Sequence, residues 1–118
     1  MTVIGVVGSR RRNSQEDFVV VRDTVLAMYE PGDQFVSGGC PKGGDAFIER
    51  IARELGAPIL IYHADWNGRG RSAGFYRNRF IADAADVLIA CVAFDRTGGT
   101  EDTIRKFEAR TGVPAVLC

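Results

Sequence analysis

The sequence predicts a Rossmann-like α/β fold, a doubly wound parallel sheet of about five strands with helices on both faces. Short apolar runs rich in β-branched residues alternate with longer segments whose apolar residues recur at helical spacing. Glycine-rich segments follow three of these runs, as is typical of strand-to-helix loops in parallel sheets. The 118 residues contain no linker or internal repeat, so we expect one domain over residues 1–118.

The first third of the chain is predicted to form a strand, a helix and a second strand. Residues 2–7 are a short apolar run that suits a buried parallel strand. Ser14 and Asp17 have the spacing of a capping box, which predicts a helix from there to about residue 29. A Pro-Gly-Asp turn then leads into a strand at 34–37.

The middle of the chain repeats this alternation. A helix is expected over about 45–55, and Gly56 suits the left-handed position that follows a helix. Residues 58–62 are predicted to form a strand, residues 63–72 a polar loop, and residues 73–85 a helix.

The last third is predicted to add two strands and one helix. Residues 87–92 form a nearly continuous apolar strand pattern. After a loop, Thr100 is predicted to cap a helix that runs to about residue 110. A final short strand is expected at 115–117.

Composition excludes several classes of protein. Lysine plus arginine and aspartate plus glutamate both number 15, so the net charge is zero and a nucleic-acid partner is not expected. No apolar run approaches the roughly 18 residues of a membrane span, so we expect no membrane partner. Three widely spaced cysteines and one histidine fit neither a zinc site nor a disulfide framework. We expect a cytoplasmic protein that uses no metal and no cofactor.

The glycine-rich segments predict a ligand pocket. Gly8-Ser9, Gly38-Gly39 and Gly98-Gly99 follow three predicted strands, and the carboxyl ends of parallel strands meet at one edge of a sheet. Glycine lets the backbone approach a ligand closely, and the N–H groups of the next helix then face it. None of these segments is a dinucleotide or ATP-binding signature, since Lys42 is followed by Gly43.

Two arginines of the predicted third helix have different expected roles. Arg77 lies within a predicted apolar face that comprises Ala73, Tyr76, Phe80, Ile81 and Ala84. We therefore expect its guanidinium to be buried and directed toward the glycine segments, where it needs either a structural carboxylate or an anionic ligand group. Arg79 lies outside that face and is expected to be exposed and near Asp83 or Asp86. Asn78 flanks both faces and can bind backbone or ligand.

The charged residues near the glycine segments allow two interpretations. Asp45 and Glu101 lie in the first turns of helices. Their carboxylates either stabilise the helices through a favourable interaction with the helix dipole, or contact a ribose or glycosidic centre of a ligand. Arg10 follows the first glycine segment and is well placed to meet a phosphate.

An aromatic residue and a cysteine complete the set of candidates. Trp66 either packs in the core or stacks on a base. Cys40 is predicted to be a pocket-wall residue rather than a nucleophile.

Several spaced motifs together resemble a known superfamily. The motifs are Val7-Gly8-Ser9-Arg10, Ser37-Gly38-Gly39-Cys40, Gly43-Gly44-Asp45, Ala64-Asp65-Trp66, Ala73-Gly74, Arg77-Asn78 and Gly99-Thr100. In this order they resemble the YspA-type (YpsA-related) branch of the SLOG superfamily, which also includes the LOG phosphoribohydrolases and DprA. Thr103 stands where LOG enzymes have a glutamate that supports cleavage of an N-glycosidic bond, which favours binding over hydrolysis.

The resemblance implies a homodimer that binds a nucleotide or nucleotide-derived small molecule of the ADP-ribose, NAD-derivative or nucleoside-monophosphate type. LOG-like hydrolysis of a nucleoside monophosphate and DprA-like binding of single-stranded DNA are the alternatives. The candidate ligand-binding residues are Gly8, Ser9, Arg10, Ser37, Gly38, Gly39, Gly43, Asp45, Trp66, Arg77, Asn78, Gly99, Thr100 and Glu101.

Overall fold

The sheet of this protein has five strands, all parallel, in the order β3-β2-β1-β4-β5. A computed structural model describes residues 1–118. The strands are β1 (Val3–Gly8), β2 (Gln34–Ser37), β3 (Ile59–Ile61), β4 (Val87–Cys91) and β5 (Val116–Leu117). The predicted fold class is confirmed, because every strand pair is parallel and helices connect the strands.

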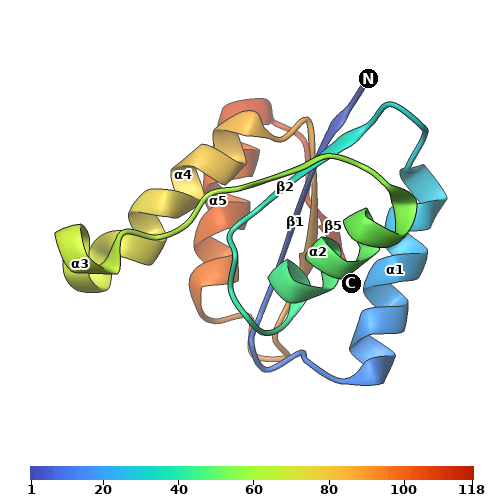
Figure 1. Cartoon of the computed structure of the whole chain (residues 1–118). Coiled ribbons are helices and arrows are strands. Elements are labelled where there is room, and N and C mark those ends of the chain that lie inside the picture. The colour runs from blue at the N-terminus through green and yellow to red at the C-terminus, as the bar shows by residue number, and fades with distance from the viewer.

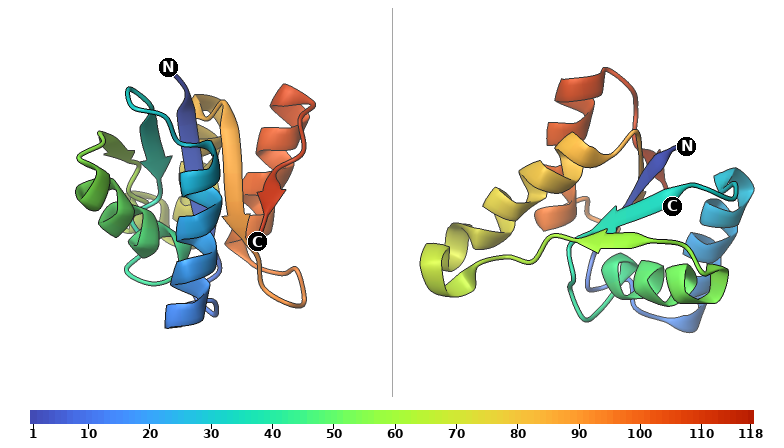
Figure 2. Two further views of the ribbon diagram at one scale, coloured as in Figure 1. Left: turned by 90° about the vertical axis from the view of Figure 1, so that its right-hand side faces the viewer. Right: turned by 45° about the horizontal axis from the view of Figure 1, so that its top comes forward.

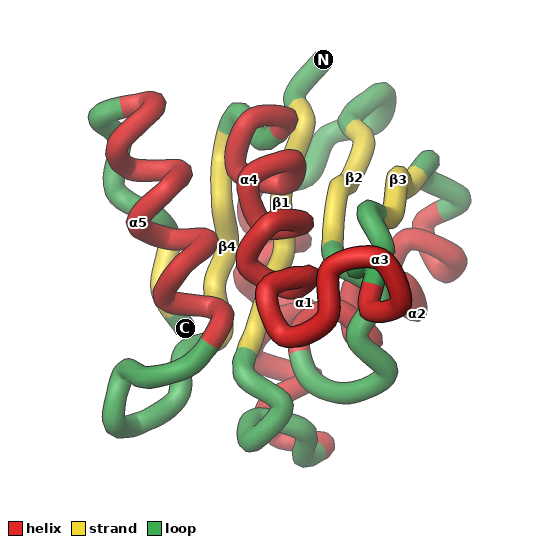
Figure 3. Tube along the Cα trace, turned by 90° about the vertical axis from the view of Figure 1, so that its left-hand side faces the viewer, coloured by secondary structure: helices red, strands yellow, loops and turns green.

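Helices cover both faces of the sheet. They are α1 (Gln15–Met28), α2 (Gly44–Leu55), α3 (Trp66–Arg69), α4 (Ala73–Ala84) and α5 (Gly99–Thr111), with a 3-10 turn, η1 (Gly70–Ser72), between α3 and α4. The tube in Figure 3 shows α4 and α5 in front of the strands, with α1 and α2 behind. Short α3 extends from the start of α4, away from the sheet (Figure 1).

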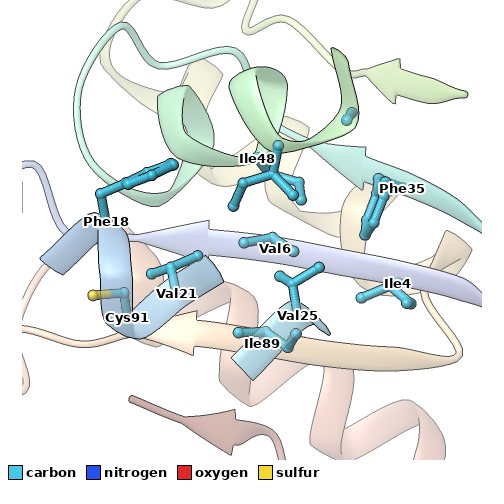
Figure 4. Packing of buried hydrophobic residues seen from close by; sticks show 11 residues of the cluster. Ile4, Val6, Phe18, Val21, Val25, Phe35, Ile48, Ile89 and Cys91 are labelled. Atoms are coloured by element: carbon cyan, nitrogen blue, oxygen red, sulfur yellow. The ribbon is translucent and has the colours of Figure 1, made fainter. Parts of the chain in front are cut away.

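Alternation along the strands builds two apolar cores. Ile4 and Val6 of β1 face α1 and α2, whereas Val7 faces α4 and α5. Figure 4 shows the first of these cores, in which Phe18, Val21 and Val25 of α1 pack against the sheet. The second core contains Ile81, Ala82 and Ala85 from the α4 region and Ile104 and Phe107 from α5. Because both faces are buried, the strands need the nearly continuous apolar runs seen in the sequence.

Two predicted helix ends are confirmed. The side chain of Ser14 accepts a hydrogen bond from the N–H of Asp17, and the Asp17 carboxylate accepts one from the N–H of Ser14. Gly56 adopts the left-handed conformation after α2, with φ of 66°.

Two local predictions are wrong. Residues 63–72 are not a plain loop, because Asp65 caps α3 by accepting a hydrogen bond from the N–H of Gly68 at 2.9 Å. This helix is too short to produce an apolar periodicity that the sequence could reveal. Thr100 does not cap α5 either, since α5 begins at Gly99 and its cap is Gly98, with φ of 107°. Such a φ favours glycine, which explains why the cap lacks a side chain that binds the helix.

The order of the strands determines where a ligand can bind. The chain first builds β1, β2 and β3 towards one edge, and then crosses to the other side of β1 to add β4 and β5. Consecutive loops therefore separate at the carboxyl ends of β1 and β4, and this divergence opens a crevice. The strand arrows in Figure 2 point to this edge, where the loop after β4 projects. No helix in the chain combines the length and the apolar character that a membrane crossing requires.

Candidate functional site

A cavity of about 440 Å³ lies at the carboxyl ends of β1 and β4. Its volume falls in the range of small-molecule sites. Nine of the predicted binding residues line it: Gly8, Ser9, Arg10, Asp45, Trp66, Arg77, Asn78, Gly99 and Thr100. The other lining residues are Val7, Arg11, Cys40, Arg71, Gly74, Phe75, Ile81, Thr97, Gly98 and Thr103. The loops after β1 and β4 meet at the cavity, as the glycine segments predict. The loop after β2 also reaches the cavity, but through Cys40.

Four predicted glycine and serine positions lie behind the cavity wall. The hydroxyl of Ser37 is buried and donates a hydrogen bond to the carbonyl of Val6 at 2.6 Å. A side chain at Gly38 would overlap Arg77, and one at Gly39 would overlap the ring of His63. Gly43, with φ of 74°, lies against the carbonyl of Ser9. These residues shape the loops that carry the lining residues.

Glu101 also lies outside the cavity lining. Its carboxylate forms two hydrogen bonds with the guanidinium of Arg96, at 2.8 and 2.9 Å. Arg96 belongs to the loop before α5 and has a left-handed φ of 54°. The pair therefore ties this loop to the first turn of α5, and the Glu101 carboxylate is engaged there.

Arg77 is directed at the loop after β2, as its place on the helix predicts, but it is half-buried rather than largely withdrawn from water. Its Nη1 donates to the carbonyls of Gly38 and Tyr62, the latter at 3.1 Å, and its Nε donates to Oδ1 of Asn78 at 3.0 Å. The sequence left open whether its partner is a carboxylate or a ligand, and the partners within the chain are two backbone carbonyls and an amide. Nη2 has no hydrogen-bond partner in the protein, so part of the guanidinium remains available to a ligand.

Asn78, rather than Arg77, is the most deeply placed polar residue of α4. Only 5% of it is exposed, and its Nδ2 donates at 3.2 Å to both the carbonyl of Gly99 and Oδ2 of Asp102. Asp102 also binds Nζ of Lys106 at 2.7 Å. Asn78 thus connects the Arg77 side chain to the N-terminus of α5 and orients both.

The helical wheel of α4 was centred on the wrong residues. Its buried residues are Ala73, Asn78, Ile81 and Ala82, whereas Phe80 is 39% exposed. The reason is that α4 packs closely along α5, which moves the buried face away from Tyr76 and Phe80. Instead, the Phe80 ring stacks on Tyr62 and contacts the Tyr76 ring edge-on.

Arg79 is exposed as expected, but the predicted pairing is wrong, because Arg79 forms an ion pair with neither Asp83 nor Asp86. Its guanidinium lies 5.1 Å from the centre of the Tyr76 ring. The carboxylate of Asp83 lies 4.0 Å from Arg110 of α5 instead.

The cavity carries an excess of positive charge, although the chain is neutral overall. Of its four arginines, only Arg11 forms an ion pair, with both oxygens of Asp95 at 2.8 and 2.9 Å. This pairing lowers the pKa of the Asp95 carboxyl. Arg10, Arg71 and Arg77 have no carboxylate within 4.0 Å. Unpaired guanidinium groups that converge on a cavity favour an anionic ligand.

Asp45 is the one carboxylate that lines the cavity. It is 5% exposed, and its Oδ2 accepts a hydrogen bond from the N–H of Cys40 at 3.1 Å. Burial raises the pKa of the Asp45 carboxyl, while the Cys40 N–H and the charge of Arg77 oppose this shift. A buried carboxyl with a raised pKa is suited to hydrogen bonding or proton transfer.

Aromatic side chains lie at the opening of the cavity. Trp66 and Phe75 are 54% and 51% exposed, so Trp66 is not a core residue. Gly74 lies beneath the Trp66 ring, where an added Cβ would come within 3.4 Å. Sequence reasoning missed Phe75 and Arg71, although their place around the start of the α4 helix was a signal that could have identified them. Two exposed rings beside unpaired arginines provide surfaces for a planar group.

Comparisons with known proteins add one partial similarity. No protein-family model and no solved structure matches the chain. The chain is 33% identical over 99 residues, or 84% of its length, to a histidine–tRNA ligase of Cutibacterium acnes. It spans about a fifth (20%) of the length of that ligase. The SLOG resemblance therefore stays a prediction.

Proposed function

We propose that the cavity binds a nucleotide-derived small molecule for sensing, sequestration or processing. The observation that carries this proposal is the set of three cavity arginines, Arg10, Arg71 and Arg77, that have no carboxylate within 4.0 Å in a protein of zero net charge. A phosphate group supplies the complementary charge and accepts the paired donors of a guanidinium.

The helix N-termini support the same assignment. Gly99, the first residue of α5, lines the cavity, and α5 has no side-chain cap. Its free N–H groups and the helix dipole favour a negative group at this position. Trp66 and Phe75 then provide a stacking surface for the base or nicotinamide ring. A ligand with both a phosphate group and an aromatic ring belongs to the nucleotide-derived class proposed above.

Binding is tested by calorimetry and thermal unfolding with AMP, ADP-ribose, NAD and ribose 5-phosphate. Adenosine and inorganic phosphate separate the contributions of the ring and the anion. A ligand at 100 times its dissociation constant adds about 2.7 kcal/mol to the free energy of unfolding. Absence of a shift with every one of these compounds would contradict the proposal.

A matched pair of variants links binding to the cavity. Arg71→Gln removes a cavity arginine, and we expect an affinity loss of about tenfold to a hundredfold, as for a charge-assisted hydrogen bond. Arg69→Gln is the control, because Arg69 is equally exposed on the same segment but stacks on the Tyr76 ring outside the cavity. Equal losses in both variants would place the ligand elsewhere.

Hydrolysis of an N-glycosidic bond is a second candidate, and Asp45 is the observation that favours it. Its carboxylate is positioned to stabilise positive charge that develops on a ribose ring. Glu101, engaged by Arg96, is less suited to this role. Release of free base from AMP, lost in Asp45→Asn but kept in Glu101→Gln, is the expected result for an enzyme. If the wild type releases no free base from AMP, the result supports binding of the ligand without hydrolysis.

The proposal includes a homodimer and a cytoplasmic location. Leu60 on edge strand β3 and Phe80 on α4 are 52% and 39% exposed, next to the stacked Tyr62 ring. A second copy of the chain would cover this apolar surface. Sedimentation of the wild type and of Phe80→Asp tests the dimer, and a wild-type monomer at micromolar concentration would contradict it.

A further inference from the structure

Cys91, the last residue of β4, and Cys118, which directly follows β5, are direct neighbours. The N–H of Cys118 donates to the carbonyl of Ala90 at 3.0 Å, and the N–H of Val92 donates to the carbonyl of Cys118 at 3.2 Å. In a parallel sheet this pattern pairs Cys118 with the residue between Ala90 and Val92, which is Cys91. The register Ala90↔Leu117 leads to the same pairing. Neighbouring strands lie about 4.7–4.9 Å apart, within the Cα separation of about 4.4–6.8 Å found for disulfides.

Both thiols lie on the same face of the sheet. Cys91 is fully buried in the core under α1, together with Phe18 and Val21 (Figure 4). Cys118 packs against this same core but is only half-buried. Cys118 is therefore the more exposed residue of the pair.

The surroundings of the pair make the two thiols unequal. A hydrogen bond from the Cys91 thiol lowers the pKa of Cys118 to about 7, and the Thr24 hydroxyl and the charge of Arg12 act in the same direction. The same hydrogen bond and burial raise the pKa of Cys91. Asp17, which also faces the pair, is neutralised by Arg12 at 2.6 Å. The Cys118 sulfur, with the lower pKa, is thus the better nucleophile of the two.

We propose that Cys118 and Cys91 form a peroxide-sensitive thiol pair that closes to a reversible disulfide. The Cys118 thiolate attacks one oxygen of hydrogen peroxide, the O–O bond breaks, and hydroxide leaves and is protonated to water. The Cys91 sulfur then attacks the resulting sulfenic acid, the S–O bond breaks, and the Cys91 proton leaves with the hydroxyl group as water. The two sulfurs lose two electrons in total, and the peroxide gains them.

Oxidation joins edge strand β5 to β4. Strand β5 has two residues and pairs only with β4, so the bond attaches this short edge strand to its one neighbour in the sheet. The bond also closes a loop that contains α5, which reduces the freedom of the unfolded chain. The oxidised protein is therefore expected to be the more stable form.

The test is controlled oxidation of the full chain. Reduced protein is treated with hydrogen peroxide, free thiols are blocked with N-ethylmaleimide, and the mass and the linked peptides are measured. We expect the loss of two hydrogen atoms, one blocked thiol instead of three, a Cys91–Cys118 linkage, and full reversal by dithiothreitol. The thermal midpoint of the wild type is expected to rise on the order of 10 °C on oxidation.

Single-cysteine variants provide the controls. Cys118→Ser abolishes the linkage and the thermal shift, whereas Cys40→Ser leaves both unchanged, since Cys40 lies in the ligand cavity. Cys118 is only half-buried, so we expect Cys118→Ser to fold even if Cys91→Ser does not. A linkage through Cys40, a disulfide between two chains, or Cys118 oxidised to sulfinic acid without a linkage would overturn the proposal.

Discussion

The core between the sheet and helices α1 and α2 has eleven buried apolar residues, whereas the interface between α4 and α5 buries Asn78, Asp102 and Thr103 beside its own apolar residues. The stability of the first core depends on the volume and shape of its side chains, and none of these side chains lines the cavity. The second combines apolar packing with a hydrogen-bond network that reaches Arg77 and the start of α5. The comparison separates residues that hold the sheet together from residues that hold the site in place.

The largest expected effect is on the stability of the apolar core. Phe35 is completely buried and stacks on Tyr29 with ring centres 5.6 Å apart. Phe35→Ala is expected to lower the free energy of unfolding by about 3–5 kcal/mol, measured by urea denaturation. Ligand affinity of the folded variant should remain that of the wild type. A loss below about 1 kcal/mol would show that this core is not the main source of stability.

Asn78→Ala should affect both stability and binding. Removal of the amide leaves Asp102 and Nε of Arg77 without one partner each, which costs roughly 1–3 kcal/mol of stability. Ligand affinity should also fall, because Arg77 and the N-terminus of α5 lose their common support. Calorimetry on Asn78→Ala and Phe35→Ala compares the two regions directly. Unchanged affinity in Asn78→Ala would contradict a positioning role.

Arg77→Lys tests the site itself. Lysine keeps the charge but loses the planar fork, so affinity should fall about tenfold to a hundredfold, measured by calorimetry. The matched control is Arg79→Lys, which changes an exposed arginine that lies over the Tyr76 ring and should alter affinity less than about threefold. If both substitutions weaken binding equally, Arg77 has no special place in the site.

The smallest expected effect is a pH dependence that arises from Asp45. Its raised pKa means that the folded state holds a proton that the unfolded state has already released. The stabilisation that the bound proton gives the folded state is therefore fully present below the pKa of the unfolded state, near 3.8. This stabilisation is lost as the pH rises through the pKa of the folded state. Asp45→Asn removes the charge, so the stability of the variant relative to the wild type should increase over that pH range. A constant difference across the range would show that the folded carboxyl has an ordinary pKa.

Short-range patterns in the sequence determined the strands, the main helices and the edge at which the loops gather. Continuous apolar runs, the Ser14–Asp17 capping box and Gly56 depend on residues only a few positions apart, so each carries its own signal. Helix α3 and the Gly98 cap were missed, because a four-residue helix has no measurable periodicity and the cap depends on a backbone conformation.

Only the tertiary structure decided how the side chains are used. Arg77 binds carbonyls 39 and 15 positions away, and Asn78 reaches Asp102 across two helices. The buried face of α4 is likewise set by its packing on α5, which a helical wheel of one segment does not contain. The pairing of Cys91 with Cys118 arises from strand register. Contacts of this kind join residues far apart in the chain, so they depend on how finished elements pack together and not on any local pattern.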